Sequence, residues 1–152
     1  MDNIKKACLV LMEKADVAYL STIGLDGFPQ TRAVYNFRNK KEFPSLVKLF
    51  KEHDDDFLVY ITTDTSSEKM RHIKNNPSAC IYYCEPKEWH GLLLTGKTEI
   101  VNDIEIKKDI WQEKWWNYYK LGPEDPEYTI LKLLPIHTKG WYYDKAFGFD
   151  LS

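Results

Sequence analysis

The sequence predicts one α+β domain, mainly β, in which about six to seven antiparallel strands close into a barrel with helices on its flanks. The length of 152 residues fits a single domain over 1–152. About seven short apolar or alternating segments are separated by turn signals, and three other segments carry apolar residues at helical spacing. Strands this short and numerous tend to close into a barrel, because closure removes exposed sheet edges.

Three helices are expected. The first covers the segment DNIKKACLVLMEKAD, where Asp2 or Asn3 can cap the start. The second covers 66–75 and ends before Pro77, because proline disfavours helical geometry in the residue that precedes it. The third opens at Asp103 and continues through the aromatic run IWQEKWWNYYK.

The predicted strands are short and are separated by loops that suit antiparallel neighbours. They are expected over 17–23, 30–37, 57–63, 78–85, 91–101, 128–136 and 139–144, with a further short strand near the end of the chain. The first two form a hairpin through the loop GLDGFP. The polar segment 38–56 is an excursion between strands, with a short amphipathic turn after Ser45.

Composition limits the classes of function. The formal net charge of -2, from 21 basic and 23 acidic residues, argues against strong non-specific binding to polyanions. Cys8, Cys80 and Cys84 form no disulfide framework, and we expect buried thiols. The four histidines are scattered, so no metal site is expected. No secretory segment and no long apolar run is visible, which predicts a cytoplasmic protein.

Aromatic residues make up 14% of the chain, including five tryptophans and ten tyrosines. They can fill a β-rich core, cover a subunit interface or wall a planar ligand. In the predicted third helix, Trp111, Trp115 and Tyr118 contribute to an aromatic stripe that packs on the barrel or reaches a ligand.

The segment TTDTSSEKMRHIKNNP, residues 62–77, combines hydroxyl side chains with a lysine at the start of a predicted helix. Thr65 and Glu68 have the spacing of a capping box, which accounts for the hydroxyls structurally. A helix start also offers free N–H groups and partial positive charge to an anion. Ser66 and Ser67 add donors and Lys69 adds a full charge, so a phosphate monoester is the alternative explanation.

A second basic residue, Arg32, lies in the middle of the predicted strand QTRAVYN. An arginine there can simply sit at a barrel rim. If its strand lies beside the strand before Lys69, the two cations can clamp one phosphate, and arginine supplies a bidentate donor pair.

Three stretches carry a family resemblance: YLSTIGLDGFPQTRAVYN, VYITTDTSSEKMRHIKNNPSACIYY and LTGKTEIV. Their order and spacing resemble the pyridoxamine 5'-phosphate oxidase-like family of FMN-binding split barrels, in particular its general stress protein 26-like branch. The resemblance extends from about residue 15 to 145. It implies a split β-barrel and a homodimer with FMN at the subunit interface.

The resemblance also implies roles for individual residues. Arg32 contacts the flavin phosphate, together with Ser67 and Lys69 of the phosphate loop. The residues implied along the flavin ring are Ala33, Val34, Tyr35 and Asn36, and those at the end of the next strand are Thr62 and Thr63. Among the aromatic residues, Trp111 is the one that we expect to stack near the flavin of the other subunit.

The implied activity is that of an FMN-dependent oxidoreductase acting on an unknown small substrate, with no catalytic residue assigned. A true pyridoxamine 5'-phosphate oxidase is not expected, because Glu68, Phe37 and Gly91 stand where those oxidases carry Arg, Lys and Gln. The final segment YYDKAFGFDLS also contains neither Arg nor His. The alternatives are a non-catalytic FMN-binding stress or storage protein, and a split barrel that binds haem or a deazaflavin.

Overall fold

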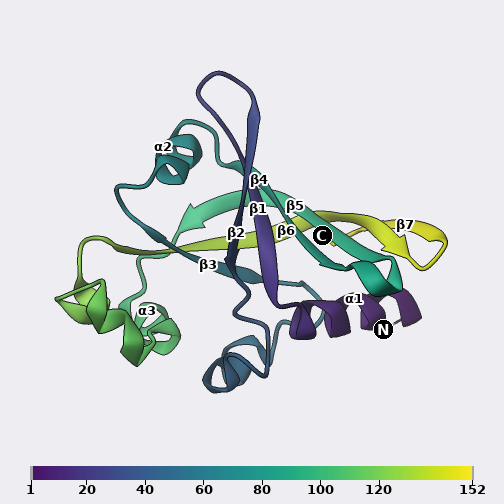
Figure 1. Cartoon of the computed structure of the whole chain (residues 1–152), viewed down its shortest axis with the longest axis horizontal. Coiled ribbons are helices and arrows are strands. Elements are labelled where there is room, and N and C mark those ends of the chain that lie inside the picture. The colour runs from purple at the N-terminus through teal and green to yellow at the C-terminus, as the bar shows by residue number, and fades with distance from the viewer. Residues whose placement is uncertain (1, 152) are drawn as a thin grey trace.

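Seven strands form one antiparallel sheet in the computed structural model, which describes residues 2–151 (Figure 1). They are β1 (Val17–Ile23), β2 (Pro29–Tyr35), β3 (Val59–Asp64), β4 (Ser78–Glu85), β5 (His90–Ile100), β6 (Tyr128–Tyr142) and β7 (Lys145–Asp150). The strand order is β2-β1-β4-β5-β6-β3, and β7 pairs with β6. The predicted α+β class, with six to seven antiparallel strands in a split barrel and flanking helices, is confirmed.

Three α-helices flank the sheet: α1 (Asn3–Lys14), α2 (Glu68–Asn75) and α3 (Ile104–Ile110). Short 3-10 segments are η1 (Pro44–Phe50), η2 (Pro86–Glu88), η3 (Glu113–Asn117) and η4 (Gly122–Glu124). The predicted cap of α1 is confirmed, because the Asp2 carboxylate accepts the Lys5 backbone N–H at 2.9 Å. α1 packs against β4 and β5, and α2 packs against β1 (Figure 1). Within the described chain, no helix has the length and apolar character needed to cross a membrane.

The two strands predicted over 128–136 and 139–144 are one long strand, β6, so their division was wrong. The register of β5 with β6 shifts between Thr95 and Gly96, which indicates a β-bulge beside Pro135. A bulge tolerates proline, because one residue there makes no ladder hydrogen bond. A Cβ on Gly96 would lie 2.7 Å from the Leu134 carbonyl oxygen, so the close approach requires glycine.

The third helix is shorter than predicted. It ends at Ile110, and the chain continues as extended backbone at Trp111 before η3. The break lets the Trp111 ring pack edge-on against Trp115 at 5.8 Å and against Tyr128 at 5.2 Å. Burial of large rings has here outweighed the helical pattern, since tertiary packing routinely overrides propensity.

Two hydrophobic clusters meet at β3. The first lies inside the sheet and includes Cys8 and Leu11 of α1 with Ile61 of β3. The second is largely aromatic and packs η1 and the α3–η4 segment on the other face of β3, where Tyr60 lies. Because both faces of β3 are covered, its position between β2 and β6 is fixed. Cys8 is buried as expected, but Cys80 and Cys84 are half-buried rather than buried.

Candidate cofactor-binding site

A cavity of about 410 Å³ lies where the two ends of the sheet approach each other. β2 and β3 are the terminal strands of the sheet order, and they lie close together without forming a ladder. Six of the residues predicted for the site line this cavity: Ala33, Val34, Tyr35, Thr62, Thr63 and Lys69. Edge strands carry backbone N–H and C=O groups that no neighbouring strand uses. The seam of the barrel therefore combines a hollow with unused backbone donors and acceptors.

Hydroxyl and ammonium groups cluster at one end of the cavity. Lys69 Nζ donates to Thr63 Oγ1 at 2.7 Å, and Thr63 Oγ1 lies 2.9 Å from Ser67 Oγ. Ser67 is the N-cap of α2, and its side chain makes no capping hydrogen bond. Its hydroxyl and the first N–H groups of α2 are therefore available to an oxyanion.

Arg32 is half-buried on β2 and is held by β1. Its Nη1 donates to Thr22 Oγ1 at 2.6 Å and to the Gln30 carbonyl oxygen at 3.1 Å. Burial lowers the pKa of Lys69, and the positive charge of Arg32 lowers it further. No carboxylate within the part of the chain that the structure describes forms an ion pair with either cation. Asp64 attracts Lys69, and Glu68 attracts Arg32, only from beyond ion-pair distance. Two neighbouring cations that form no ion pair suit a bound anion.

The predicted capping box is wrong. Thr65 Oγ1 instead donates to the Pro126 carbonyl oxygen at 2.6 Å. The helix begins two residues later than the box requires, because a turn closes first through the Ser67 N–H and the Asp64 carbonyl oxygen at 3.0 Å. Glu68 Oε1 lies 3.2 Å from Nε2 of the buried His72, one turn along α2.

Five of the predicted site residues are not among those that line the cavity: Arg32, Asn36, Ser66, Ser67 and Trp111. Arg32 and Ser67 belong to the basic and hydroxyl groups described above. Ser66 is exposed, and its hydroxyl donates to Glu127 Oε2 at 2.7 Å. Trp111 belongs to the aromatic cluster, and its indole nitrogen is buried without a partner among residues 2–151. Asn36 is buried at the C-terminal end of α1. The expected stacking of Trp111 on a flavin of another subunit stays a prediction.

The Asn36 side chain stabilises the C-terminal end of α1. Its Nδ2 donates to the carbonyl oxygens of Met12 and Ala15, at 2.8 and 2.9 Å, where α1 ends. We expect Asn36→Ala to lower the free energy of unfolding by about 2 kcal/mol, because it leaves buried carbonyls unpaired. Chemical denaturation monitored by circular dichroism measures this. The exposed Asn102, exchanged for alanine as the control, should change it by less than about 0.5 kcal/mol. Equal effects of the two exchanges would contradict this role.

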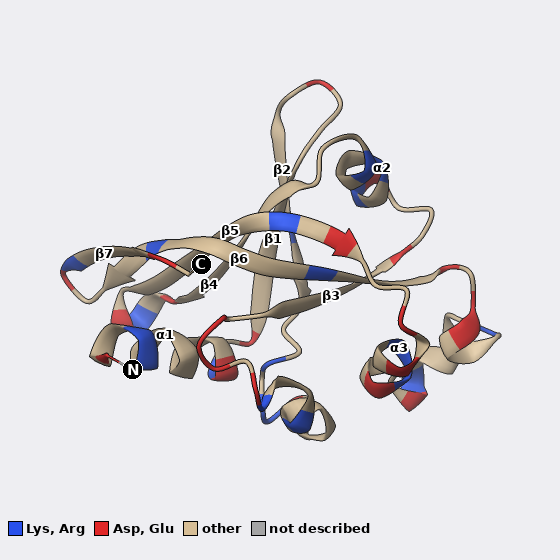
Figure 2. Ribbon diagram, turned by 180° about the vertical axis from the view of Figure 1, so that it is seen from behind, with Lys and Arg blue, Asp and Glu red and all other residues tan. Residues whose placement is uncertain are grey.

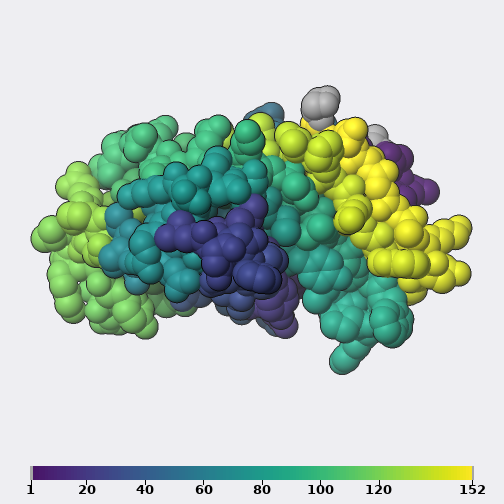
Figure 3. Space-filling view, turned by 90° about the horizontal axis from the view of Figure 1, so that it is seen from above, coloured from purple at the N-terminus to yellow at the C-terminus, as the bar shows by residue number. Residues whose placement is uncertain are grey.

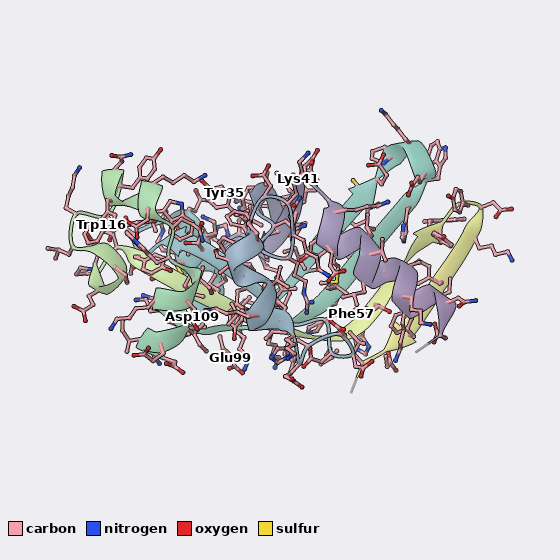
Figure 4. All side chains as sticks on the ribbon, turned by 90° about the horizontal axis from the view of Figure 1, so that it is seen from below. Tyr35, Lys41, Phe57, Glu99, Asp109 and Trp116 are labelled. Atoms are coloured by element: carbon pink, nitrogen blue, oxygen red, sulfur yellow. The ribbon has the colours of Figure 1, made fainter. Side chains whose placement is uncertain are left out.

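A second cavity, of about 440 Å³, adjoins the first and shares Tyr35, Thr62, Asp64 and Tyr119 with it. Thr62 Oγ1 is buried without a partner in the described chain, although Thr62 lines both cavities. The Tyr119 hydroxyl donates to the Asp64 carboxylate, and burial together with this bond raises the pKa of Tyr119. In Figure 4, Tyr35 lies between Lys41 and the segment that carries Trp116. Sequence reasoning missed Asp64 and Tyr119, although Asp64 stands within the quoted segment 62–77.

A third hollow, of about 500 Å³, lies between β4, the η2 turn and the far end of β6. It is lined by Tyr82, Cys84, Pro86, Trp89, His90, Gly91, Trp141 and Tyr143. Figure 3 shows the η2 projection in teal beside the yellow β6–β7 end. A Cβ on Gly91 would lie 2.1 Å from the Tyr82 hydroxyl oxygen, so the tyrosine occupies the space that a longer residue would need.

Comparison with known proteins gives consistent results. Residues 48–149 match the protein family described as pyridoxamine 5'-phosphate oxidase like. The chain is 32% identical over 136 residues to general stress protein 26 of Bacillus subtilis, covering 88% of this chain and 84% of that protein. It is 33% identical over 115 residues to a pyridoxine/pyridoxamine 5'-phosphate oxidase of Flavobacterium psychrophilum, and this match covers 73% of this chain but only 44% of that enzyme.

A crystal structure of a protein related to general stress protein 26, from Clostridium acetobutylicum, superimposes with a TM-score of 0.77 at 24% identity, covering 99% of this chain and 97% of that chain.

Proposed function

The chain belongs to the pyridoxamine 5'-phosphate oxidase-like family, and on that premise we propose that it binds FMN in the cavity between β2 and β3. The observation that carries this proposal is that Arg32 and Lys69, which form no ion pair with a carboxylate of the described residues, lie beside the hydroxyls of Thr63 and Ser67. A phosphate monoester supplies the charge and the acceptor oxygens that this group lacks.

The rest of the cavity fits a planar ring with a polar edge. The β2 backbone at Ala33 and Val34 lines the hollow at a sheet edge, where its N–H and C=O groups have no strand partner. The buried Thr62 Oγ1 has no hydrogen-bond partner within residues 2–151, and a ligand in the cavity can provide one. Tyr35 supplies an aromatic wall.

A homodimer is part of the proposal. The outer face of β2, β1 and β4 exposes Val17, Tyr19, Tyr35 and Tyr82, each between 37% and 44%. The register joins Val17 to Tyr35 and Tyr19 to Tyr82, so these side chains form one continuous apolar surface next to the cavity. Exposed patches of this kind mark interaction surfaces. A second copy on this face would bury the patch and cover the open side of the FMN cavity.

As an enzyme, the protein would be an oxidoreductase acting on a small substrate. FMN supplies the hydride and electron chemistry when bound. The chain's own residues then hold the phosphate at Arg32, Ser67 and Lys69 and exclude water with Tyr35. Glu68, Phe37 and Gly91 differ from the Arg, Lys and Gln of the true oxidases, which argues against pyridoxamine 5'-phosphate as the substrate.

A non-catalytic FMN-binding protein is the second candidate. One observation favours it: Asp64, the carboxylate that lines the cavity, already accepts the Tyr119 hydroxyl. Among the described residues that line this cavity, no carboxylate or histidine is therefore left free to move a proton to or from a substrate.

The purified full chain, incubated with FMN and freed of excess cofactor, should retain about one FMN per chain, with absorption bands near 375 and 450 nm. A Soret band without flavin bands would point instead to haem. A chain that takes up no FMN and carries no chromophore would overturn the proposal. Anaerobic mixing with NADH or NADPH then separates the two candidates: bleaching of the flavin band supports an oxidoreductase, and an unchanged band supports a carrier.

A further inference from the structure

Arg38 is a buried arginine outside the cofactor cavity. It follows β2 and is only 4% exposed. Its Nε donates to the Leu58 carbonyl oxygen at 3.0 Å, and its Nη2 donates to the His53 carbonyl oxygen at 2.9 Å. The guanidinium carbon lies 4.5 Å from the centre of the Phe50 ring. These contacts fix the guanidinium group and use two of its three nitrogens.

The charge of Arg38 is not matched by a neighbouring carboxylate. Its Nη1 is buried without a hydrogen-bond partner, and within residues 2–151 no carboxylate lies within ion-pair distance of the side chain. Of the acids near Arg38, Glu13 pairs with Lys40 at 3.0 Å and Asp56 pairs with His53 at 2.8 Å, whereas Asp54, which lines the cavity described next, lies beyond ion-pair distance of Arg38. A buried charge without a partner is costly, so such groups in native proteins call for an explanation.

Arg38 lines a cavity of about 280 Å³ between α1 and η1, the unlabelled blue coil at the foot of Figure 1. Its polar lining comprises Arg38, Lys40, Lys48 and Lys51 with Glu13 and Asp54, and its apolar lining comprises Leu9, Phe37, Val47 and Phe50. Basic groups therefore outnumber acidic ones. Figure 2 shows Lys and Arg positions in blue on η1 and on the chain that leads into it. Small-molecule pockets usually start near this size, which suits a small ligand.

We propose that this cavity is a second binding site, for a small organic anion that carries one carboxylate or phosphate on a short apolar body. The anionic group lies against the Arg38 guanidinium group, which lines the cavity, and Lys48 and Lys51 at the rim add attraction. The apolar body packs on Phe37 and Val47. The site is separate from the proposed FMN cavity, with which it shares no lining residue.

Benzoate, phenyl phosphate, inorganic phosphate and neutral benzyl alcohol are suitable probes. Titrated into the full ¹⁵N-labelled chain, benzoate or phenyl phosphate should shift the Arg38 Nε–H signal, with a Kd of about 1 mM or lower. Inorganic phosphate should bind more weakly than phenyl phosphate, because it lacks the apolar body. Benzyl alcohol should produce no such shift. Equal responses to benzoate and benzyl alcohol, or an unmoved Arg38 signal, would overturn the proposal.

Exchange of Arg38 would also break its hydrogen bonds to the Leu58 and His53 carbonyl oxygens. The decisive variant therefore changes lysines at the rim of the cavity. Lys48 and Lys51 are exposed, and the double exchange K48Q/K51Q should weaken benzoate binding about tenfold. Lys41→Gln removes an exposed charge from the same segment outside the lining, and should leave binding unchanged. Lys69→Met distinguishes the two cavities. If Lys69→Met abolishes benzoate binding while K48Q/K51Q does not affect it, the anion occupies the FMN cavity and the second site does not exist.

Discussion

Gly140→Ala should lower the free energy of unfolding by about 3 kcal/mol, which corresponds to a fall in Tm of about 6–12 °C. Gly140 lies on β6 opposite β5, and a Cβ there would lie 1.9 Å from the Gly91 carbonyl oxygen. That neighbour is backbone of the adjoining strand, so it cannot rotate away. To relieve this clash, β5 and β6, which border the third hollow, must move apart. Thermal unfolding followed by circular dichroism measures the loss.

Gly148→Ala on β7 is the matched control for this exchange. A Cβ at Gly148 would meet its nearest atom, the Thr138 carbonyl oxygen, at 3.4 Å, which is an ordinary contact. Both glycines are strand residues without positive φ, so close approach is the difference between them. We expect Gly148→Ala to change stability by no more than about 0.5 kcal/mol. Similar losses at both positions would mean that β5 and β6 are not packed as closely as described.

Lys69→Met should weaken FMN binding about 10- to 100-fold, because a hydrogen bond to a charged group contributes about 1.5–3 kcal/mol. Arg32→Met should have an effect of the same size. Burial and the charge of Arg32 both lower the pKa of Lys69, so the cofactor-free protein gains nothing from this charge. The cofactor-free Lys69→Met variant should therefore be no less stable than the parent. Fluorescence titration with FMN and thermal unfolding together test both expectations.

Lys74→Met provides the comparison for Lys69→Met, since Lys74 lies on the same helix but is exposed and outside the cavity. Its loss changes the net charge equally and should alter FMN affinity less than twofold. If Lys69 and Lys74 exchanges weaken binding alike, the effect is long-range attraction and the proposed phosphate contact is wrong.

The sequence predicted the first hairpin and most of the strand positions because the alternation of apolar residues is a local signal. β4 was predicted at its observed bounds, 78–85. β6 was wrongly divided just after Pro135, into 128–136 and 139–144, although the strand continues through both segments. The bulge that accommodates Pro135 depends on Gly96 of another strand. The sequence of residues 128–144 alone therefore does not predict this bulge.

The candidate site was predictable only in part, for the same reason. Arg32 and Lys69 were singled out by their residue types beside recognisable elements. Asp64 and Tyr119 meet across the fold through the irregular α3–η4 segment, whose path is set by ring packing rather than by periodicity. Arg38 was not singled out, because only its burial without a partner makes it unusual. Burial of a charge is a property of the folded chain.

The pairing of β3 with β6 has a consequence for the chain as it leaves the ribosome. Val59 of β3 pairs with Leu133 of β6, and β6 is the only strand that pairs with β3 in the described sheet. Synthesis proceeds at about 5–20 residues per second, so roughly 4 to 16 s pass between the completion of β3 and that of β6. Throughout that interval the apolar run FLVYI has an unpaired edge, which is a template for aggregation. Slower growth, which lowers the number of nascent chains present together, should therefore raise the soluble yield.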